Sequence, residues 1–303
     1  MTAGPSLDLE AFLLREREQV EQALERSLEA FQGDLATDLV GPVRHAVMTG
    51  GKRLRPILCT VAYRTCGGIG GQVTYDLGVS LELVHAYSLM HDDLPCMDDA
   101  QLRRGRPTPH TLYGEEATVR AGLSLIPAAS LQAVRAARAL ECADHVVRAI
   151  VQELNRAAGG GGMVGGQYLD LLAEGRALTS EELDDVHRKK TGALLTASLV
   201  IGGLAAGASE STLGGLRGYG RAVGLAFQIT DDVLDGTSSA ANLGKNPSDG
   251  VLAKSTYVSL HGVEQAVRRA RTLTGQALEA LRTARISAPE LDALAHYVVE
   301  RKR

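Results

Sequence analysis

Two groups of aspartates are the residues of this sequence best suited to chemistry. The first lies in the segment HDDLPCMDDAQLRRG, where Asp92, Asp93 and Asp98 fall close together and two arginines follow. Carboxylates crowded in this way repel one another unless a cation lies between them. The segment is therefore a candidate metal site, although a single acidic cluster is more often a solvated surface.

Pro95 decides whether these aspartates can meet. On an unbroken helix Asp92 and Asp98 would point about 120° apart, because each residue turns the helix by ~100°. A proline disfavours helical geometry in the residue before it and has no amide hydrogen to donate. We therefore expect the helix to end near Leu94 and Asp98 to fold back toward Asp92.

The second group lies in the segment FQITDDVLD. Asp231 and Asp235 are four residues apart and share one face of a regular helix, and Gln228 lies one turn earlier, beside Asp231 and Asp232. Both acidic segments adjoin apolar helical stretches, where an unpaired carboxylate is costly. Two such motifs in one chain favour a metal site over two solvated faces.

The ligand types predict which metal and which kind of substrate. Oxygen ligands without clustered histidines or cysteines favour Mg²⁺, which keeps several waters and is often shared with substrate phosphates. Arginine binds phosphate through two parallel hydrogen bonds and lysine as a point charge, so both suit a phosphorylated substrate. Each cation alone could be an ordinary surface charge. The candidates are Lys52, Arg53, Arg55, Arg103, Arg104, Lys189, Lys190, Lys245 and Lys254.

The elements that must position these residues are expected to be helices. Apolar residues recur at helical spacing, as in Leu9, Phe12, Leu13 and Val20, whereas alternating strand patterns are rare. The longest uncharged stretch, residues 191–209, contains four glycines and several hydroxyl side chains, so we interpret it as a buried helix and not as a membrane span.

Composition excludes several classes of function. The 303 residues carry 32 Lys and Arg against 36 Asp and Glu, only 4% aromatic residues and no Trp. A net charge of −4 and so few aromatic rings argue against nucleic-acid binding. The four cysteines form no CxxC pair and the first residues form no signal peptide, so we expect reduced thiols and a cytoplasmic protein.

A family resemblance joins these motifs. In order, GGKRLRP, HAYSLMHDDLPCMDDAQLRRGRPT, KTGAL, GLAFQITDDVLD, LGK and KSTY resemble the trans-isoprenyl diphosphate synthases, most closely the bacterial farnesyl and geranylgeranyl diphosphate synthases. The resemblance runs from about Gly50 to Tyr257. It implies one all-α domain over residues 1–303, of the isoprenoid synthase fold, with antiparallel helices around a deep central cleft. It also implies a homodimer.

The same resemblance implies an activity and a role for each motif residue. Isopentenyl diphosphate would be condensed with C5 and C10 allylic diphosphates to farnesyl diphosphate, through magnesium-assisted ionisation to an allylic carbocation. Several Mg²⁺ ions would be bound by Asp92, Asp93, Asp98, Asp231, Asp232 and Asp235. The allylic substrate would contact Arg103, Lys190, Gln228 and Lys254, and Thr191 and Lys245 would also bind substrate. The catalytic residues would be Asp92, Asp93, Asp98, Asp231 and Lys190. Isopentenyl diphosphate would contact Lys52, Arg55, His85 and Arg104.

Product length is expected to depend on Tyr87 and Ser88, just before the first aspartate motif. Tyr87 lies five residues before Asp92, ~7.5 Å deeper along the helix at a rise of ~1.5 Å per residue. Its ring could close the floor of an apolar cavity, as in the bacterial farnesyl-producing pattern. The alternative interpretation is an ordinary core tyrosine.

Three departures from the family pattern leave alternatives open. Leu123 stands where a cleft-facing aspartate is usual, the loop from Gly244 to Asp249 is one residue short, and Val258 replaces a common proline. The alternatives are a geranylgeranyl diphosphate synthase and a weakly active or regulatory synthase subunit. A terpene cyclase of the same fold is disfavoured, because the second motif is aspartate-rich and GGKRLRP serves a second substrate.

Overall fold

The structure is a computed structural model that describes residues 7–237 and 255–301. Apart from one two-stranded hairpin, its elements in the described ranges are helices, as the sequence predicts. They are α1 Leu9–Gln32, α2 Thr37–Met48, α3 Leu54–Thr65, α4 Gln72–Asp92, β1 Leu102–Arg103, β2 Arg106–Pro107, α5 Pro109–Tyr113, α6 Glu115–Ala139, α7 Asp144–Ala158, α8 Met163–Leu172, α9 Ser180–His187, the π-helix η1 Arg188–Gly192, α10 Ala193–Ala205, α11 Glu210–Thr237, α13 Tyr257–His261, α14 Val263–Thr283 and α15 Pro289–Glu300.

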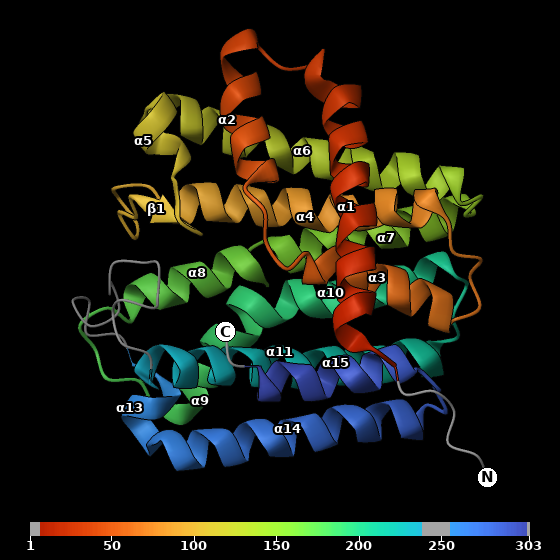
Figure 1. Cartoon of the computed structure of the whole chain (residues 1–303), viewed down its shortest axis with the longest axis vertical. Helices are drawn as coiled ribbons and strands as arrows, with labels where there is room; N and C mark the ends of the chain where they lie inside the picture. Colours follow the sequence, from red (N-terminus) through yellow and green to blue (C-terminus); the bar gives the residue numbers. More distant parts are fainter. Residues whose placement is uncertain (1–6, 238–254, 302–303) are drawn as a thin grey trace.

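The helices surround two buried central members, α4 and α10. α4 packs against α1, α3 and α6, while α10 packs against α3, α7 and α11. Figure 1 shows α4, α6, α10, α11 and α14 lying roughly parallel to one another, with α1 crossing them. Helices that are apolar on all sides must be buried, and α10 is buried from Leu194 to Gly203. The expectation of a buried helix in residues 191–209 is therefore confirmed.

One hydrophobic core extends through the described chain, from Phe12 in α1 to Val298 in α15. No helix within the described ranges is long and apolar enough to cross a membrane.

Close packing of α10 on α3 depends on glycine. A Cβ on Gly202 would lie 2.1 Å from the carbonyl oxygen of Cys59, a backbone atom that cannot turn aside. The missing side chain lets the two helix backbones approach, and this approach places the start of α3, with its cluster of cations, beside the centre of the molecule. Gly275, in the exposed face of α14, has nothing within 4 Å of the position of its Cβ.

We predict opposite effects for alanine at these two helical glycines. Gly202→Ala should lower the free energy of unfolding by about 2 kcal/mol or more, because the helices must separate. Gly275→Ala should raise it by about 0.5 to 1 kcal/mol, because alanine restricts the unfolded chain and fits a helix interior. Urea unfolding followed by circular dichroism measures both values. Equal effects of the two substitutions would contradict this account of the α3 and α10 contact.

Candidate active site

The first aspartate motif folds back on itself at the end of α4. The helix ends at Asp92, and the backbone amide of Asp98 donates a hydrogen bond to the carbonyl oxygen of Asp92 at 2.9 Å. The amide of Asp99 likewise reaches the carbonyl of Leu94 at 3.1 Å. The turn that Pro95 predicts is thus confirmed, and it brings the two aspartates to the same end of the helix.

Asp93 takes a different direction from its neighbours. Its side chain is 1% exposed and accepts two hydrogen bonds from Arg103, from Nε to Oδ2 at 2.7 Å and from Nη2 to Oδ1 at 2.5 Å. Arg103 lies in β1 of the short hairpin, where it pairs with Arg106 of β2. The pair anchors the hairpin to the end of α4. Asp93 was expected to bind the metal and Arg103 the allylic substrate. In the structure the two side chains instead form an ion pair with each other.

The second motif divides its aspartates in the same way. Asp232 accepts a hydrogen bond from the backbone amide of Tyr257 at 2.8 Å and lies 3.5 Å from Nε2 of His187. These contacts fasten α13 and α9 to α11. Asp231 is more exposed, at 37% of its side chain, and accepts a hydrogen bond from Gln228 at 3.3 Å. Asp235 lies one turn further along α11, near its exposed end.

A cavity of about 340 Å³ begins at the first motif and runs along α4. Asp92, Lys190 and Arg55 lie among its polar residues. Most of the remaining wall comes from α4 and α8 and includes Tyr87, Ser88, Leu89, Met97, Met163, Val164, Tyr168 and Leu171. A cavity with this lining can hold an anionic group at one end and an apolar chain along its length. Tyr87 and Ser88, the two residues expected to set product length, both line this cavity.

The π-helix η1 carries Lys190 and Thr191 into this cavity. Short π-helical turns shift the side chains of a helix and are frequent at functional sites. Lys190 Nζ lies 2.7 Å from Asp170 on α8. Thr191 donates a hydrogen bond to Gln228 at 2.5 Å, and Gln228 in turn reaches Asp231. A Cβ on Gly166 of α8 would lie 2.1 Å from the Lys190 amide, so only glycine permits this close approach.

Asp92 is the carboxylate whose protonation the site changes most clearly. Burial raises the pKa of its carboxyl to about 6, and nearby Asp98 and Asp93 act in the same direction. Lys190 and Arg103 favour the ionised form but do not offset burial. A carboxylate that is costly to ionise without a further cation is a good fit for a metal ligand.

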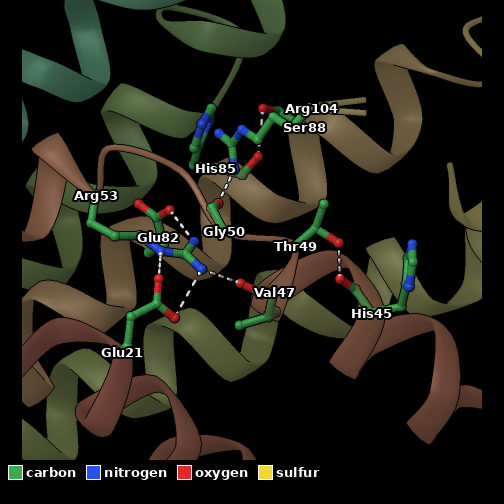
Figure 2. Close-up of polar contacts among 10 residues, drawn as sticks. All are labelled: Glu21, His45, Val47, Thr49, Gly50, Arg53, Glu82, His85, Ser88 and Arg104. Carbon is green, nitrogen blue, oxygen red and sulfur yellow. Dashed lines mark hydrogen bonds and ion pairs between the residues drawn. The ribbon is translucent and has the colours of Figure 1, made fainter. Parts of the chain in front are cut away.

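Positive charges gather around His85, which lines the same cavity as Arg55, and we call this group of residues the cation pocket. Burial, opposed by the charge of Glu82 and assisted by that of Arg104, lowers the pKa of Arg55 to about 10. Burial, and then Arg55 and Arg104, hold the pKa of His85 well below its usual range, so this imidazole is neutral. Arg104 Nη1 donates a hydrogen bond to the carbonyl oxygen of Gly50, which joins the hairpin to the GGKRLRP loop (Figure 2). Burial, and then the charge of Arg301, lower the pKa of the Lys52 amine, and the charge of Asp231 opposes them.

Arg301, at the end of the described chain, is a site residue that the sequence does not reveal. Its side chain is 3% exposed and its Nη2 lies 2.7 Å from Oδ1 of Asp231. It also donates to the carbonyl of Phe227 at 3.1 Å and stacks over the Phe227 ring at 4.0 Å. Seventy positions separate Arg301 from Asp231, and a basic residue near a terminus gives no signal of such a contact.

These residues fit Mg²⁺ as the cation of the site. Within residues 7–237 and 255–301, no three acidic, histidine or cysteine side chains lie close enough to hold a metal without other ligands. Mg²⁺ does not need them, since one or two carboxylates with water and substrate phosphates are its usual set. Asp92 with Asp98, and Asp231 with Asp235, provide two such pairs. The predicted contacts Lys245 and Lys254 lie outside the described residues.

Comparisons with known proteins agree with one another. The family model for polyprenyl synthetase matches residues 37–289. Farnesyl diphosphate synthase of Escherichia coli is 41% identical over 295 residues, which cover 94% of this chain and 96% of that protein. Geranylgeranyl pyrophosphate synthase 12 of Arabidopsis thaliana is 38% identical over 91% of this chain and 76% of its own. The crystal structure of Helicobacter pylori geranyltransferase with magnesium and isoprenyl diphosphate has a TM-score of 0.78 at 30% identity, covering 98% of each chain.

We predict that the affinity for Mg²⁺ increases as the pH rises through about 6. The pKa of Asp92 in the folded protein lies above its ordinary value of 3.8, so below pH 6 this carboxyl carries a proton that a metal ion must displace. Calorimetric titration of the protein with MgCl₂ between pH 5 and pH 8, without added phosphate or pyrophosphate, measures the change. Asp92→Asn should bind Mg²⁺ weakly and lose this pH dependence. An affinity of the parent that is flat across this range would contradict the assignment.

Proposed function

The chain belongs to the polyprenyl synthetase family, and we propose that it is a short-chain trans-prenyltransferase that makes farnesyl diphosphate. It would join isopentenyl diphosphate first to the C5 and then to the C10 allylic diphosphate. The observation that carries the proposal is the cavity, which has the carboxylate of Asp92 and the amine of Lys190 at one end and apolar walls that lead to Tyr87. An anionic head and a hydrocarbon tail are thereby accommodated in one space.

On the allylic side, Asp92 and Asp98 would face Asp231 and Asp235 across the diphosphate and hold Mg²⁺ in several sites. When bound, the metal neutralises charge that develops on the departing diphosphate. Lys190 lies beside Asp92 and is fixed by Asp170, so its ammonium group adds a positive charge at the same oxygens. Thr191 and Gln228 join this wall to Asp231 and keep it in place.

We assign Asp93, Asp232 and Arg103 a different role from the one that the sequence suggests. Asp93 and Arg103 neutralise each other in a buried, two-bond pair, and Asp232 is fixed by the amide of Tyr257. Taking a buried carboxylate from such a pair leaves its partner unpaired, which is costly. These three side chains would therefore shape the walls, and Asp92, Asp98, Asp231 and Asp235 would meet the metal. Asp231 is also paired with Arg301, but 37% of its side chain is exposed, compared with 1% for Asp93.

On the isopentenyl side, Lys52, Arg55 and Arg104 would bind the second diphosphate. Arg55 lies in the wall of the cavity, so its guanidinium points toward the space where the allylic substrate would react. The neutral imidazole of His85 can accept or donate a hydrogen bond without adding to the charge of the nearby arginines. The bond between C1 and oxygen of the allylic diphosphate would break, and the alkene of isopentenyl diphosphate would attack C1. The resulting tertiary cation would lose a proton from C2 of the isopentenyl unit to the released diphosphate, which forms the new double bond.

We propose further that the protein is a homodimer joined through α5 and α6. Leu123, Pro127 and Leu131 form an exposed apolar stripe along α6, and Leu112 and Tyr113 of α5 extend it. Apolar patches of this kind mark interaction surfaces, and a dimer with twofold symmetry buries the same patch on both subunits. Leu123 does not line the cavity, so its difference from aspartate removes no group from the substrate site. That placement argues against a merely regulatory subunit.

One incubation tests the proposed activity. The purified chain, with Mg²⁺ and isopentenyl diphosphate, receives the C5, C10 or C15 allylic diphosphate, and the product lengths are determined after removal of phosphate. We expect farnesyl diphosphate from the C5 and C10 primers and little elongation of the C15 primer. Efficient C15 elongation would identify a geranylgeranyl diphosphate synthase, cyclic hydrocarbons would identify a cyclase, and inactivity would identify a regulatory subunit. Each of these outcomes would contradict the proposal.

Tyr87→Ala should lengthen the product to geranylgeranyl diphosphate or beyond. The Tyr87 ring packs edge to face on His91, with 5.0 Å between the ring centroids, and its removal opens the cavity below Asp92. The first condensation should keep a similar rate, because the polar end is unchanged. Truncating an aromatic side chain can cost about 3 kcal/mol of stability, so circular dichroism must first show that the variant is folded.

A reciprocal variant serves as its control. Ser88→Phe adds a ring to the same wall and should shorten the product toward geranyl diphosphate, again without altering the metal site. If both variants fold, remain active and give the parental product distribution, another residue forms the floor.

Leu123→Asp combined with Leu131→Asp should convert the dimer to a monomer, because the interface would bury two unpaired charges on each subunit. Light scattering after size-exclusion chromatography gives the mass directly. Leu172→Asp is a matched control, since this leucine of α8 is 58% exposed compared with 53% for each of the other two. A monomeric parent, or a double variant that stays dimeric, would refute the proposed interface.

A further inference from the structure

Arg53 lies between the two cations of the GGKRLRP segment, Lys52 and Arg55, but its side chain does not join them. It is 2% exposed and enters the interior of the helix bundle. Nη1 donates to Oε1 of Glu82 at 2.7 Å, Nε donates to Oε1 of Glu21 at 2.8 Å, and Nη2 donates to the carbonyl oxygen of Val47 at 2.8 Å. Figure 2 shows this guanidinium surrounded by its three partners.

These partners come from three different helices. Glu21 lies in α1, Val47 in the last turn of α2 and Glu82 in the middle of α4, while Arg53 itself precedes the first residue of α3. The last carbonyls of a helix have no partner within it and attract positive charge. One guanidinium therefore ties the start of α3 to three neighbours and satisfies an otherwise unpaired end of α2.

The backbone of the loop needs such a constraint. Gly50 and Gly51 have φ angles of 81° and 129°, and Arg53 itself has φ 49° and ψ 33°. The φ and ψ angles of Arg53 are those of the left-handed helical region, which costs a residue other than glycine roughly 1 kcal/mol or more. Such residues persist where the surrounding structure holds them. The hydrogen bonds of its own side chain hold Arg53 in this conformation.

The outer side of the same loop faces the cation pocket. The Gly50 carbonyl accepts a hydrogen bond from Arg104, and a Cβ on Gly51 would lie 2.5 Å from Arg104 Nη1. Arg55, two residues after Arg53, lines the cavity. Glu82 also acts beyond its own pair, because its charge raises the pKa of Arg55 and of Arg104 against the larger effect of burial. The buried pair thus lies directly behind the cations that would bind a diphosphate.

We propose that Arg53 is a positioning residue that, through Glu82, Glu21 and Val47, fixes the loop that presents Lys52 and Arg55 to the isopentenyl diphosphate and that holds Arg104 through the Gly50 carbonyl. The inference rests on the proposed function for the identity of this substrate. Of the three basic residues in GGKRLRP, Lys52 and Arg55 would then contact the substrate, and Arg53 would hold the backbone.

Arg64 offers a matched control at the other end of α3. It also joins α1 and α4, through Glu16 at 2.9 Å and through the hydroxyl of Tyr75 at 2.5 Å. It does not line the cavity, and it lies beyond the loop. Arg53→Met removes two ion pairs and Arg64→Met removes one, each between α3 and its neighbours, but only the first should affect the diphosphate pocket.

Two measurements distinguish positioning from general stability. Calorimetric titration with isopentenyl diphosphate alone, which cannot react without an allylic partner, gives its Kd for each variant. Steady-state kinetics then gives KM for isopentenyl and geranyl diphosphate separately. Arg53→Met should raise both Kd and KM for isopentenyl diphosphate by about tenfold, because small displacements of binding groups have large effects. KM for geranyl diphosphate should change by less than about twofold. Arg64→Met should lower the melting temperature but leave these constants at parental values.

Milder variants keep the inference testable if Arg53→Met does not fold. Glu21→Gln removes the charge of the more exposed partner, and Arg53→Lys keeps the charge but loses the planar fork, so each should weaken binding of isopentenyl diphosphate less than Arg53→Met does. Equal effects of the Arg53 and Arg64 variants, or parental constants in every Arg53 and Glu21 variant that folds, would overturn the inference. A parent that binds isopentenyl diphosphate but forms no product would refute the proposed function alone, because the binding comparison would still report on Arg53.

Discussion

Repulsion among like charges is the constraint on which the structure depends. Carboxylates lie close together around Asp92, and arginines lie close together around His85. Neither group is stable without a countercharge. The protein supplies part of that countercharge internally. Asp93 is neutralised by Arg103, Asp231 meets Arg301, and Lys190 is held by Asp170. Fewer carboxylate oxygens then remain exposed at the site than the two motifs contain. Mg²⁺ needs only one or two carboxylates when water and substrate phosphates supply its other ligands.

The two aspartate motifs solve this problem in parallel ways. In each, the second aspartate turns inward and fastens a neighbouring segment, the β1 and β2 hairpin in one case and α13 in the other. Inward aspartates therefore have a structural function that the motif pattern does not separate from metal binding. The cations show the same division, because Arg53 turns into the interior whereas Arg55 lines the cavity. Neighbours in sequence thus face opposite directions where the backbone leaves the helical conformation.

Close backbone approach provides the other half of the architecture. Gly202 lets α10 meet α3, and Gly166 lets α8 meet the π-helix that carries Lys190. Because a π-helical turn redirects its side chains, Lys190 and Thr191 enter the cavity from a helix that otherwise packs within the core. The apolar walls and the polar end of the cavity are thereby positioned by the same helix contacts.

The sequence alone determined the fold class and the local geometry of the acidic motifs. Helical periodicity predicted the all-α architecture, Pro95 predicted the turn that returns Asp98 to Asp92, and the glycine-rich uncharged stretch predicted the buried α10. Such features depend on residues near one another in the chain, whose conformational preferences are legible in the sequence. The family resemblance added the substrate class and some of the residues that line the cavity, among them Tyr87, Asp92 and Lys190.

Only the tertiary structure decided which of these charged residues face the cavity. Asp93, Asp232 and Arg53 look like their neighbours in sequence, and their partners Arg103, Tyr257 and Glu82 are identified only when separate elements pack together. Arg301 reaches Asp231 across seventy positions, and Leu123, expected in the cleft, lies on the outer face of α6. The physical reason is that the direction of a charged side chain is set by burial and by its countercharge. Both belong to the packed molecule, and no local pattern of residues encodes them.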